Sequence, residues 1–200
     1  MIHFATDDLA PEDRFEHWRE VRGRSLFGVT IELAPERRPS FRGTFRAQIV
    51  GGAVATDMRA SAYRVNRTES DIAKIAGDSL CIGLQVKGSG TLDTGKDRIH
   101  AVRDGDMTIN HSDLPYWGTP GGHDNFHYKM LKIPLSDTLT LGRPAHDLLA
   151  ARYFDSSAFA RPFRALFNAL SVGHSLLVDP AQDVAHIARL AMVARGRLAA

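Results

Sequence analysis

The chain has 200 residues, of which 44% are hydrophobic and 24% charged, the composition of an ordinary globular domain. Its net charge is only +2, and acids or glycine interrupt its arginine clusters, which argues against a nucleic-acid-binding surface. Cys81 is the single cysteine, so an internal disulfide is excluded. The first residues lack the features of a signal peptide, and no segment approaches the roughly 18 apolar residues of a membrane span. We therefore expect a cytoplasmic protein with no membrane partner.

The N-terminal region predicts a helix. Asp7 and Asp8 are candidate N-cap residues, Pro11 suits the first turn, and Gly23 suits a left-handed cap at the end of the helix. A narrow stripe with helical spacing follows from Phe15, Trp18, Val21 and Arg22. We expect Trp18 to anchor this helix against the wall of the strands that come next.

From Phe41 the hydrophobic period changes to two, which indicates half-buried strands. Glycine-containing turns at Gly88, Gly95, Gly105 and Gly121 separate short alternating segments. The further strand candidates are Ala53–Met58, Ala62–Arg67, Ser79–Val86, Gly90–Asp93, Arg98–Val102, Met107–Asn110 and Phe126–Ile133. No helix-length segment separates consecutive strands, so the pattern favours an eight-stranded jelly roll over an α/β sheet.

The tail, residues 136–200, is rich in Ala and Leu and predicts helices. One covers Ser136–Leu141, a second lies between Ser157 and Val172, and the last opens at Asp179-Pro180. Apolar residues share one face of the last helix: Val184, Ile187, Ala188, Ala191, Ala194 and Leu198. This stripe would bury itself either against a partner helix or against the barrel of its own chain. The fold class is therefore mainly β with α, with the N-terminal helix and barrel in residues 1–135 and a helical tail in 136–200.

Four segments, in this linear order, carry a family resemblance. They read FATDDLAPEDRFEHWREVRGRSLFGVTIE, AYRVNRTESDIAK, LQVKGSGTLDTGKDRIHAVRDGDMTINHSDLPYWGTPGG and LGRPAHDLLAARYFDSSAFARPFRALFNAL. From roughly Phe4 to Leu198 the chain resembles the N-terminal ligand-binding and dimerisation domain of AraC-type transcriptional regulators.

The resemblance implies a cupin-like barrel that senses a small-molecule effector, and a tail that forms a homodimer. The dimer interface would be Val184, Ile187, Ala188, Ala191 and Leu198. In that family a pair of helix-turn-helix motifs normally follows, and this chain stops where they would begin. We therefore expect DNA binding only through that missing module, with the effector shifting the populations of two arrangements.

A ligand cavity at the barrel mouth is the leading site hypothesis. Aromatic rings would stack on a flat ligand, and His111 and Gln85 would supply hydrogen bonds. Arg64 and Arg67 would suit recognition of a carboxylate as bidentate donors; the alternative is that they are solvent-exposed arginines of a strand, which is the commoner case. The aromatic residues concerned are Tyr116, Trp117, Phe126 and Tyr128. The alternative is a packed barrel core with Trp117 against the tail helices.

The orientation of the strand Ser79–Val86 stays open. Either Leu80, Ile82, Leu84 and Val86 point inward, or Cys81, Gly83 and Gln85 do. Helices outside the barrel would allow both sets to be buried.

The sequence gives little support for catalysis, a metal or a cofactor. The nine histidines include no His-x-His pair, and on a strand His123 and His127 would lie about 13 Å apart. Cys81 has no neighbouring histidine or aspartate in the sequence SLCIGLQV. The alternative to a sensor is a stand-alone metal-dependent cupin enzyme that uses dispersed histidines such as His100, His111 and His127. A third reading is a sensor that has lost its ligand and keeps only dimerisation.

Overall fold

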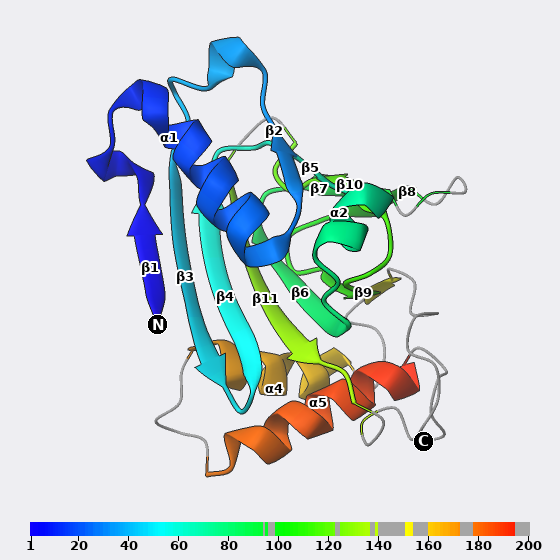
Figure 1. The fold of residues 1–200 in the computed structure, drawn as a ribbon. Helices are drawn as coiled ribbons and strands as arrows, with labels where there is room; N and C mark the ends of the chain where they lie inside the picture. The colour runs from blue at the N-terminus through cyan, green and yellow to red at the C-terminus, as the bar shows by residue number, and fades with distance from the viewer. Residues whose placement is uncertain are drawn as a thin grey trace.

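The computed structural model of the chain describes residues 1–93, 95, 99–122, 125–136, 139, 151–153, 160–172 and 178–194. Within them, two antiparallel sheets form a jelly-roll barrel with helices packed outside it (Figure 1). The 7-stranded sheet has, in spatial order, β1 (Ile2–Ala5), β3 (Gly43–Val50), β4 (Ala53–Ala60), β11 (Phe126–Pro134), β6 (Ser79–Lys87), β9 (Met107–His111) and β12 (Ala151–Tyr153). The 5-stranded sheet has β2 (Thr30–Glu32), β5 (Arg64–Arg67), β10 (Tyr116–Thr119), β7 (Gly90–Asp93) and β8 (Ile99–Val102). The predicted mainly-β jelly roll with helices is confirmed.

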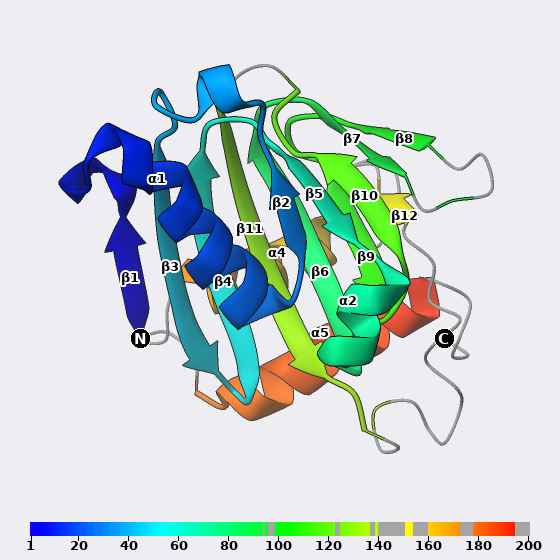
Figure 2. The ribbon, with the colours of Figure 1, turned by 45° about the horizontal axis from the view of Figure 1, so that its top comes forward.

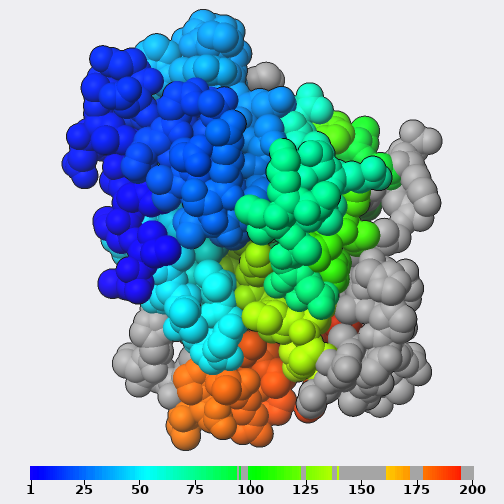
Figure 3. Space-filling view, in the orientation of Figure 1, coloured from blue at the N-terminus to red at the C-terminus, as the bar shows by residue number. Residues whose placement is uncertain are grey.

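The helices lie on opposite faces of the larger sheet (Figures 1 and 2). One face carries the N-terminal helices, and the other carries α4 and α5. The helical segments are η1 (Thr6–Asp8), α1 (Pro11–Trp18), the π-helix η2 (Arg19–Phe27), η3 (Pro35–Arg37), α2 (Glu69–Lys74), α4 (Ala160–Val172) and α5 (Pro180–Ala194). In the space-filling view the N-terminal helices and α2 together cover one side of the barrel (Figure 3). None of the helices in these described ranges has the length and hydropathy needed to cross a bilayer.

The β3–β4 hairpin sets the register of the larger sheet. Val50 pairs with Ala53 across a two-residue turn, Gly51-Gly52, in which both residues have positive φ (53° and 83°). This is the turn geometry that matches the twist of antiparallel strands and that glycine adopts without strain.

Alternate residues bury both faces of the larger sheet. Leu80, Ile82 and Leu84 of β6 lie in one apolar core with α4 and α5. Cys81 and Gln85 of the same strand face the space between the two sheets. Apart from Val86, which is 37% exposed, both sets are buried because helices cover the outer face, so the two orientations left open by the sequence describe the two faces of one strand.

The stripe of α5 packs against the chain's own sheet. Ala194 of this stripe is only partly buried, but four other members are 5% exposed or less and share the core with β6, β9 and β11. They are Val184, Ile187, Ala188 and Ala191. The expectation that a partner helix covers this stripe is therefore corrected, because these four side chains are already covered within the chain. Leu198 lies outside the described residues.

The N-terminal helix forms the second core. Phe15 and Trp18 are fully buried against Phe41 and Phe45, so Trp18 is the anchor that the sequence predicted. Gly43 is required beneath it, since a Cβ there would come within 2.6 Å of the Trp18 ring.

The predicted end of this helix at Gly23 is wrong. The helix instead widens into the π-helix η2, and Gly28, with φ of 60°, caps it by donating its amide hydrogen to the Gly23 carbonyl.

The short elements were missed. Tyr116 and Trp117 were expected in the loop that follows the strand Met107–Asn110, yet residues 116–119 form β10, which pairs with β5 on one side and β7 on the other. Strands β1, β2 and β12 and helix α2 were also absent from the prediction. Such short segments owe their structure to partners distant in the sequence. Most of the expected helix Ser136–Leu141 lies outside the described residues, whereas α4 and α5 fall where the sequence placed them, and Asp179 accepts the N-cap hydrogen bond from Gln182.

Candidate functional site

A cavity of about 120 Å³ lies between the two sheets. Strands β6, β9 and β11 form one wall, β5, β7 and β10 form the other, and the π-helix η2 contributes Arg22 and Phe27. The lining is mainly apolar, with Met58, Val65 and Phe126 among it. For comparison, an apolar protein cavity of about 150 Å³ accommodates benzene. The barrel is therefore not fully packed, and the space suits a small organic molecule.

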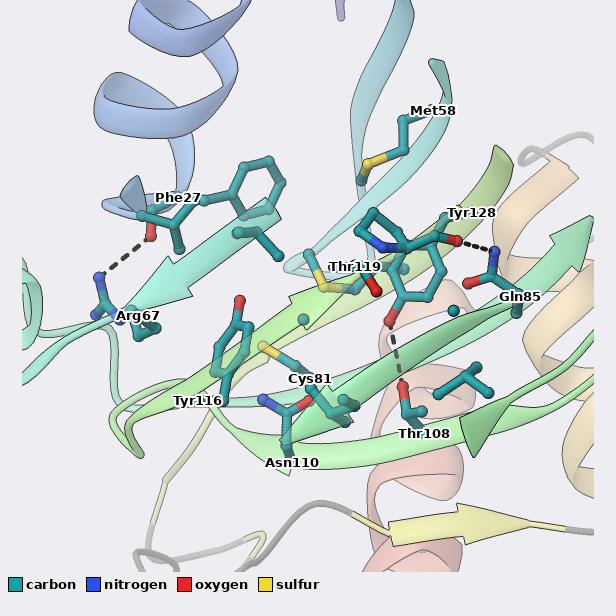
Figure 4. Close-up of a pocket in the computed structure, with 18 of the residues that line it drawn as sticks. Phe27, Met58, Arg67, Cys81, Gln85, Thr108, Asn110, Tyr116, Thr119 and Tyr128 are labelled. Atoms are coloured by element: carbon teal, nitrogen blue, oxygen red, sulfur yellow. Dashed lines mark hydrogen bonds between the residues drawn. The ribbon is translucent and has the colours of Figure 1, made fainter. Parts of the chain in front are cut away.

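Three tyrosines line the cavity: Tyr63, Tyr116 and Tyr128. The rings of Tyr116 and Tyr128 point into the same space (Figure 4). The Tyr128 hydroxyl is 3.2 Å from that of Thr108 on β9, and it lies directly over Gly83, where any Cβ would overlap it. Burial raises the pKa of Tyr128 to about 12 and also raises the pKa values of Tyr63 and Tyr116. All three therefore stay protonated at neutral pH and can act as hydrogen-bond donors.

Gln85 holds the rim of the cavity in place. Its side-chain nitrogen lies within hydrogen-bond distance of three carbonyls, those of Lys87 (3.0 Å), Gly88 (2.5 Å) and Pro120 (2.7 Å), which share its two hydrogens. The amide thereby ties the turn after β6 to the end of β10. Its nitrogen has no capacity left for a ligand.

Arg67, Ser112 and Asp113 form a hydrogen-bonded polar corner of the barrel, in which every nitrogen of the Arg67 guanidinium has an acceptor. The side chain is 4% exposed, and all three of its nitrogens donate hydrogen bonds. The acceptors are the carbonyls of Ser112, Phe27, Gly28 and Ile75 and the carboxylate of Asp113. Four backbone carbonyls and a carboxylate satisfy this guanidinium within the protein. It orders the corner and offers no free donor to a ligand.

Asp113 is the acid of this corner. Burial alone would raise its pKa, but hydrogen bonds from the Gly77 and Asp78 amides and the Ser112 hydroxyl outweigh burial and lower it. Arg67 lies 3.3 Å away as an ion-pair partner. Asp113 therefore stays ionised at neutral pH.

Three of the predicted ligand-binding residues lie away from the cavity lining. His111 is 2% exposed, and its Nε2 is 3.1 Å from the Asp78 carboxylate while its Nδ1 accepts from the Asp113 amide. Arg64 and Trp117 project from the outer face of the smaller sheet, where the guanidinium stacks 4.8 Å above the indole ring. The strand alternation explains this, because Arg67 and Tyr116 take the inward positions on the same two strands. Gln85, Tyr116, Phe126 and Tyr128 do line the cavity.

Arg22 lines the cavity and was not recognised as a site residue. Its side chain is 7% exposed and packs between the rings of Phe27 (5.0 Å) and Tyr63 (5.6 Å). Its Nη2 contacts the Met58 sulfur at 3.7 Å, while Nε and Nη1 have no hydrogen-bond partner. The signal was present in the sequence, because Arg22 occupies a position of the buried Phe15–Trp18 stripe.

The described histidines His111 and His127 pair with single carboxylates in different places. His127 is 2.8 Å from Asp57 on β4, and His111 pairs with Asp78 instead. Within the part of the chain that the structure describes, no three His, Cys, Asp or Glu side chains are grouped as metal ligands would be. The arrangement of His100, His111 and His127 therefore gives no support to the metal-dependent alternative.

A jelly-roll barrel with an internal, mainly apolar cavity defines a small-molecule-binding domain of the cupin-like type. The model of one family, the AraC-like ligand binding domain, matches residues 62–191, and the chain belongs to this family. The crystal structure of the AraC-like transcriptional activator CuxR is similar with a TM-score of 0.71 at 17% identity, over 96% of this chain and 69% of that one. At this identity the likeness establishes the fold.

Two further crystal structures resemble only part of the chain. AerE from Microcystis aeruginosa has a TM-score of 0.41 at 12% identity, covering 55% of this chain and 47% of its own. The Cupin_2 domain of an XRE family transcriptional regulator from Enterobacter cloacae has a TM-score of 0.38 at 6% identity, covering 47% and 98%. A search of curated proteins finds no match.

Proposed function

We propose that this chain is the ligand-sensing and dimerisation domain of an AraC-like transcriptional regulator and not an enzyme. The barrel, residues 1–135, binds a small-molecule effector in the cavity. The helical tail, residues 136–200, passes the bound state to helix-turn-helix modules outside this chain. The observation that carries the proposal is that β6, β9 and β11 line the cavity with one face and pack against α4 and α5 with the other.

A short hydrogen-bonded path supports the transmission step. The Gly105 amide donates to the backbone carbonyl of Gln85, 2.6 Å away, and Gln85 lines the cavity. The Gly105 carbonyl in turn accepts a 2.6 Å hydrogen bond from Arg164 of α4. An effector that shifts the rim of the cavity would therefore act on α4 through a single turn of backbone.

The homodimer belongs to the same proposal, with its contact on the outward faces of the C-terminal helices. The inward stripe of α5 is used by the sheet. Exposed side chains remain on the other side, among them Ala165 and Asn168 of α4 and His186 and Arg189 of α5. A symmetric pair would bring each of these faces against its counterpart.

Cys81 provides a built-in test of effector binding. It is the only cysteine of the chain and lines the cavity, and burial raises the pKa of its thiol to about 11. Compounds that raise the melting temperature are tested for slowing the reaction of this thiol with a disulfide reagent. An effector at about 100 times its Kd adds about 2.7 kcal/mol to the free energy of unfolding and slows labelling by about 100-fold.

Two variants make this test specific to the cavity. Cys81→Leu fills the cavity without removing a hydrogen bond and is expected to abolish the thermal shift. Cys81→Ala keeps the space open and is expected to preserve the shift. If every compound that stabilises the chain leaves the labelling rate of Cys81 unchanged, effectors bind elsewhere and the cavity is not the sensor.

A further inference from the structure

Arg22 is a buried cation with no counter-ion among the residues that the structure describes. Arg22 is only 7% exposed to solvent, and its Nε and Nη1 atoms make no hydrogen bond. Only the weak contact from Nη2 to the Met58 sulfur and the two flanking aromatic rings stabilise it. An arginine keeps its charge inside a protein, and an unpaired buried charge is strongly unfavourable. The cation–π contacts place the guanidinium over two aromatic rings but provide no hydrogen-bond acceptor for Nε and Nη1.

The cavity supplies no acid to balance this charge. Among the described residues that line it there is no aspartate or glutamate. The other arginine, Arg67, is saturated by carbonyls and Asp113. Lys132 lines the cavity too, but its ammonium lies beside Gly77, whose amide binds the same Asp113 carboxylate. Arg22 is therefore the lining cation that is both buried and without an acceptor for its Nε and Nη1, whereas Lys132 is only partly buried and lies on the Gly77 side of the cavity.

A second unsatisfied donor lies next to Arg22. The Tyr63 hydroxyl is buried beside the indole N–H of Trp18, which is itself a donor, so among the described residues the hydroxyl proton has no acceptor; the Tyr63 ring is one of the two that flank the guanidinium. Both groups line the cavity. A guanidinium and a phenol hydroxyl together match an oxyanion that accepts several hydrogen bonds.

We propose that the effector is a small monocarboxylate whose carboxylate binds Arg22 and Tyr63. Its apolar body occupies the space lined by Met58, Val65 and Phe126. The lining around Arg22 is mainly apolar, and burying a singly charged carboxylate there costs less desolvation energy than burying a phosphate dianion. This assignment rests on the proposed function and names the chemistry of its ligand.

The test compares matched pairs of ligands on the wild-type chain. Calorimetry measures the binding of butanoate, hexanoate and phenylacetate, each against its neutral amide, with inorganic phosphate as a further probe. At least one carboxylate is expected to bind about tenfold or more tightly than its amide and to protect Cys81 from labelling. Failure of all three carboxylates to bind, or amides that bind as tightly, would overturn the assignment. Tighter binding of phosphate than of any carboxylate would overturn it as well.

Variants locate the interaction. Arg22→Gln is expected to reduce carboxylate affinity to that of the amide, whereas Arg24→Gln, an exposed arginine of the same π-helix, leaves it unchanged. The unliganded Arg22→Gln chain is also expected to unfold at a higher urea concentration, since the variant removes an unpaired buried charge. Unchanged carboxylate binding in Arg22→Gln would overturn the role of Arg22. If Arg22→Gln does not fold, the comparison of acids with amides on the wild-type chain still decides the proposal.

The two proposals fail in different ways. If neutral compounds bind and protect Cys81 while carboxylates do not, the cavity is still the effector site, and only the assignment of a monocarboxylate is rejected. If no compound of any charge protects Cys81, the sensing function itself falls.

Discussion

Arg64 and Arg67 lie three positions apart on β5, and strand alternation sends their side chains to opposite faces of the smaller sheet. Arg64 stacks on Trp117 at the surface with 52% of its side chain exposed, whereas Arg67 is 4% exposed and joins four carbonyls and a carboxylate. One interpretation of the sequence was that both guanidinium groups bind a carboxylate of the ligand. Neither guanidinium can bind a ligand in the cavity, because Arg64 faces outward and every donor of Arg67 already has an acceptor within the protein.

Replacing Arg67 is expected to cost far more stability than replacing Arg64. Arg67→Ala leaves four buried carbonyls and Asp113 without their donor, which costs about 3–5 kcal/mol of the free energy of unfolding. Arg64→Ala, its matched control on the same strand, removes a surface stack and costs less than about 1 kcal/mol. Urea unfolding measured for both variants checks this. Equal losses would mean that the corner around Arg67 does not hold the fold.

Asp113 gives the fold a defined acid sensitivity. Burial acts to raise its pKa, but the amide hydrogen bonds from Gly77 and Asp78 outweigh burial, so the pKa in the folded chain lies below the usual value. As the pH falls below about 4, the unfolded chain binds a proton that the folded chain does not, and stability is lost through the lowered pKa. Asp113→Asn is expected to lose about 2 kcal/mol at neutral pH.

The pH dependence distinguishes this ionisation from simple loss of packing. The stability difference between wild type and Asp113→Asn is expected to narrow as the pH is lowered from about 5 to about 3. Urea midpoints measured across that range provide the readout, with the exposed Asp8→Asn as control. A difference that stays constant with pH would contradict the role of the carboxylate charge.

At the scale of elements, the long strands and the last helices were predictable and the short elements were not. The period-two alternation of residues 79–86 and the Asp179-Pro180 start signal are encoded locally, so β6 and α5 lie where they were expected. The strand β10 has only four residues and exists through its pairing with β5 and β7, which no local pattern shows.

The residues of the candidate site also divide into those that the sequence predicted and those that it did not. The aromatic residues Tyr116, Phe126 and Tyr128 were found because aromatic side chains near strand ends are visible in the sequence. Arg22 was overlooked because helical spacing marks a position as buried without saying whether a charge buried there has a partner. Trp117 was expected in the site because it was assigned to a loop at the barrel mouth, whereas β10 places the side chains of Tyr116 and Trp117 on opposite faces.

The two faces of the C-terminal helices are expected to respond differently to substitution. Ile187→Ala removes a fully buried side chain from the core under the sheet and costs about 2–5 kcal/mol of unfolding free energy. Ala165→Glu on the exposed face of α4 costs less than about 0.5 kcal/mol and raises the dimer Kd at least about tenfold, because a symmetric contact repeats the added charge. Sedimentation and urea unfolding of both variants separate the effects. If Ile187→Ala abolished the dimer without changing the free energy of unfolding, the dimer contact would lie on the inward stripe of α5 and not on the outward face.

At the scale of the whole molecule, the cavity and the C-terminal helices are neighbours across one sheet. Cavity-lining and helix-bearing residues alternate along β6, β9 and β11, so a ligand contacts the same strands that support α4 and α5. Adjacency alone does not establish coupling between two sites. The connection from Gln85 through Gly105 to Arg164 is the part of this arrangement that a single substitution can interrupt.

Arg164→Gln is expected to separate effector binding from the response of α4. Arg164 contacts the carbonyl of Gly105 and lies outside the cavity lining, so the effector Kd stays within about twofold of wild type. Hydrogen exchange measured with and without effector gives the response: in wild type the effector slows exchange of the α4 amides, by an amount that corresponds to a coupling of about 1–3 kcal/mol. In Arg164→Gln this slowing disappears, whereas it persists in Arg161→Gln, an exposed arginine one turn earlier on the same helix. Equal slowing in both variants would mean that the sheet itself, and not the Gly105 turn, carries the signal from the cavity to the tail.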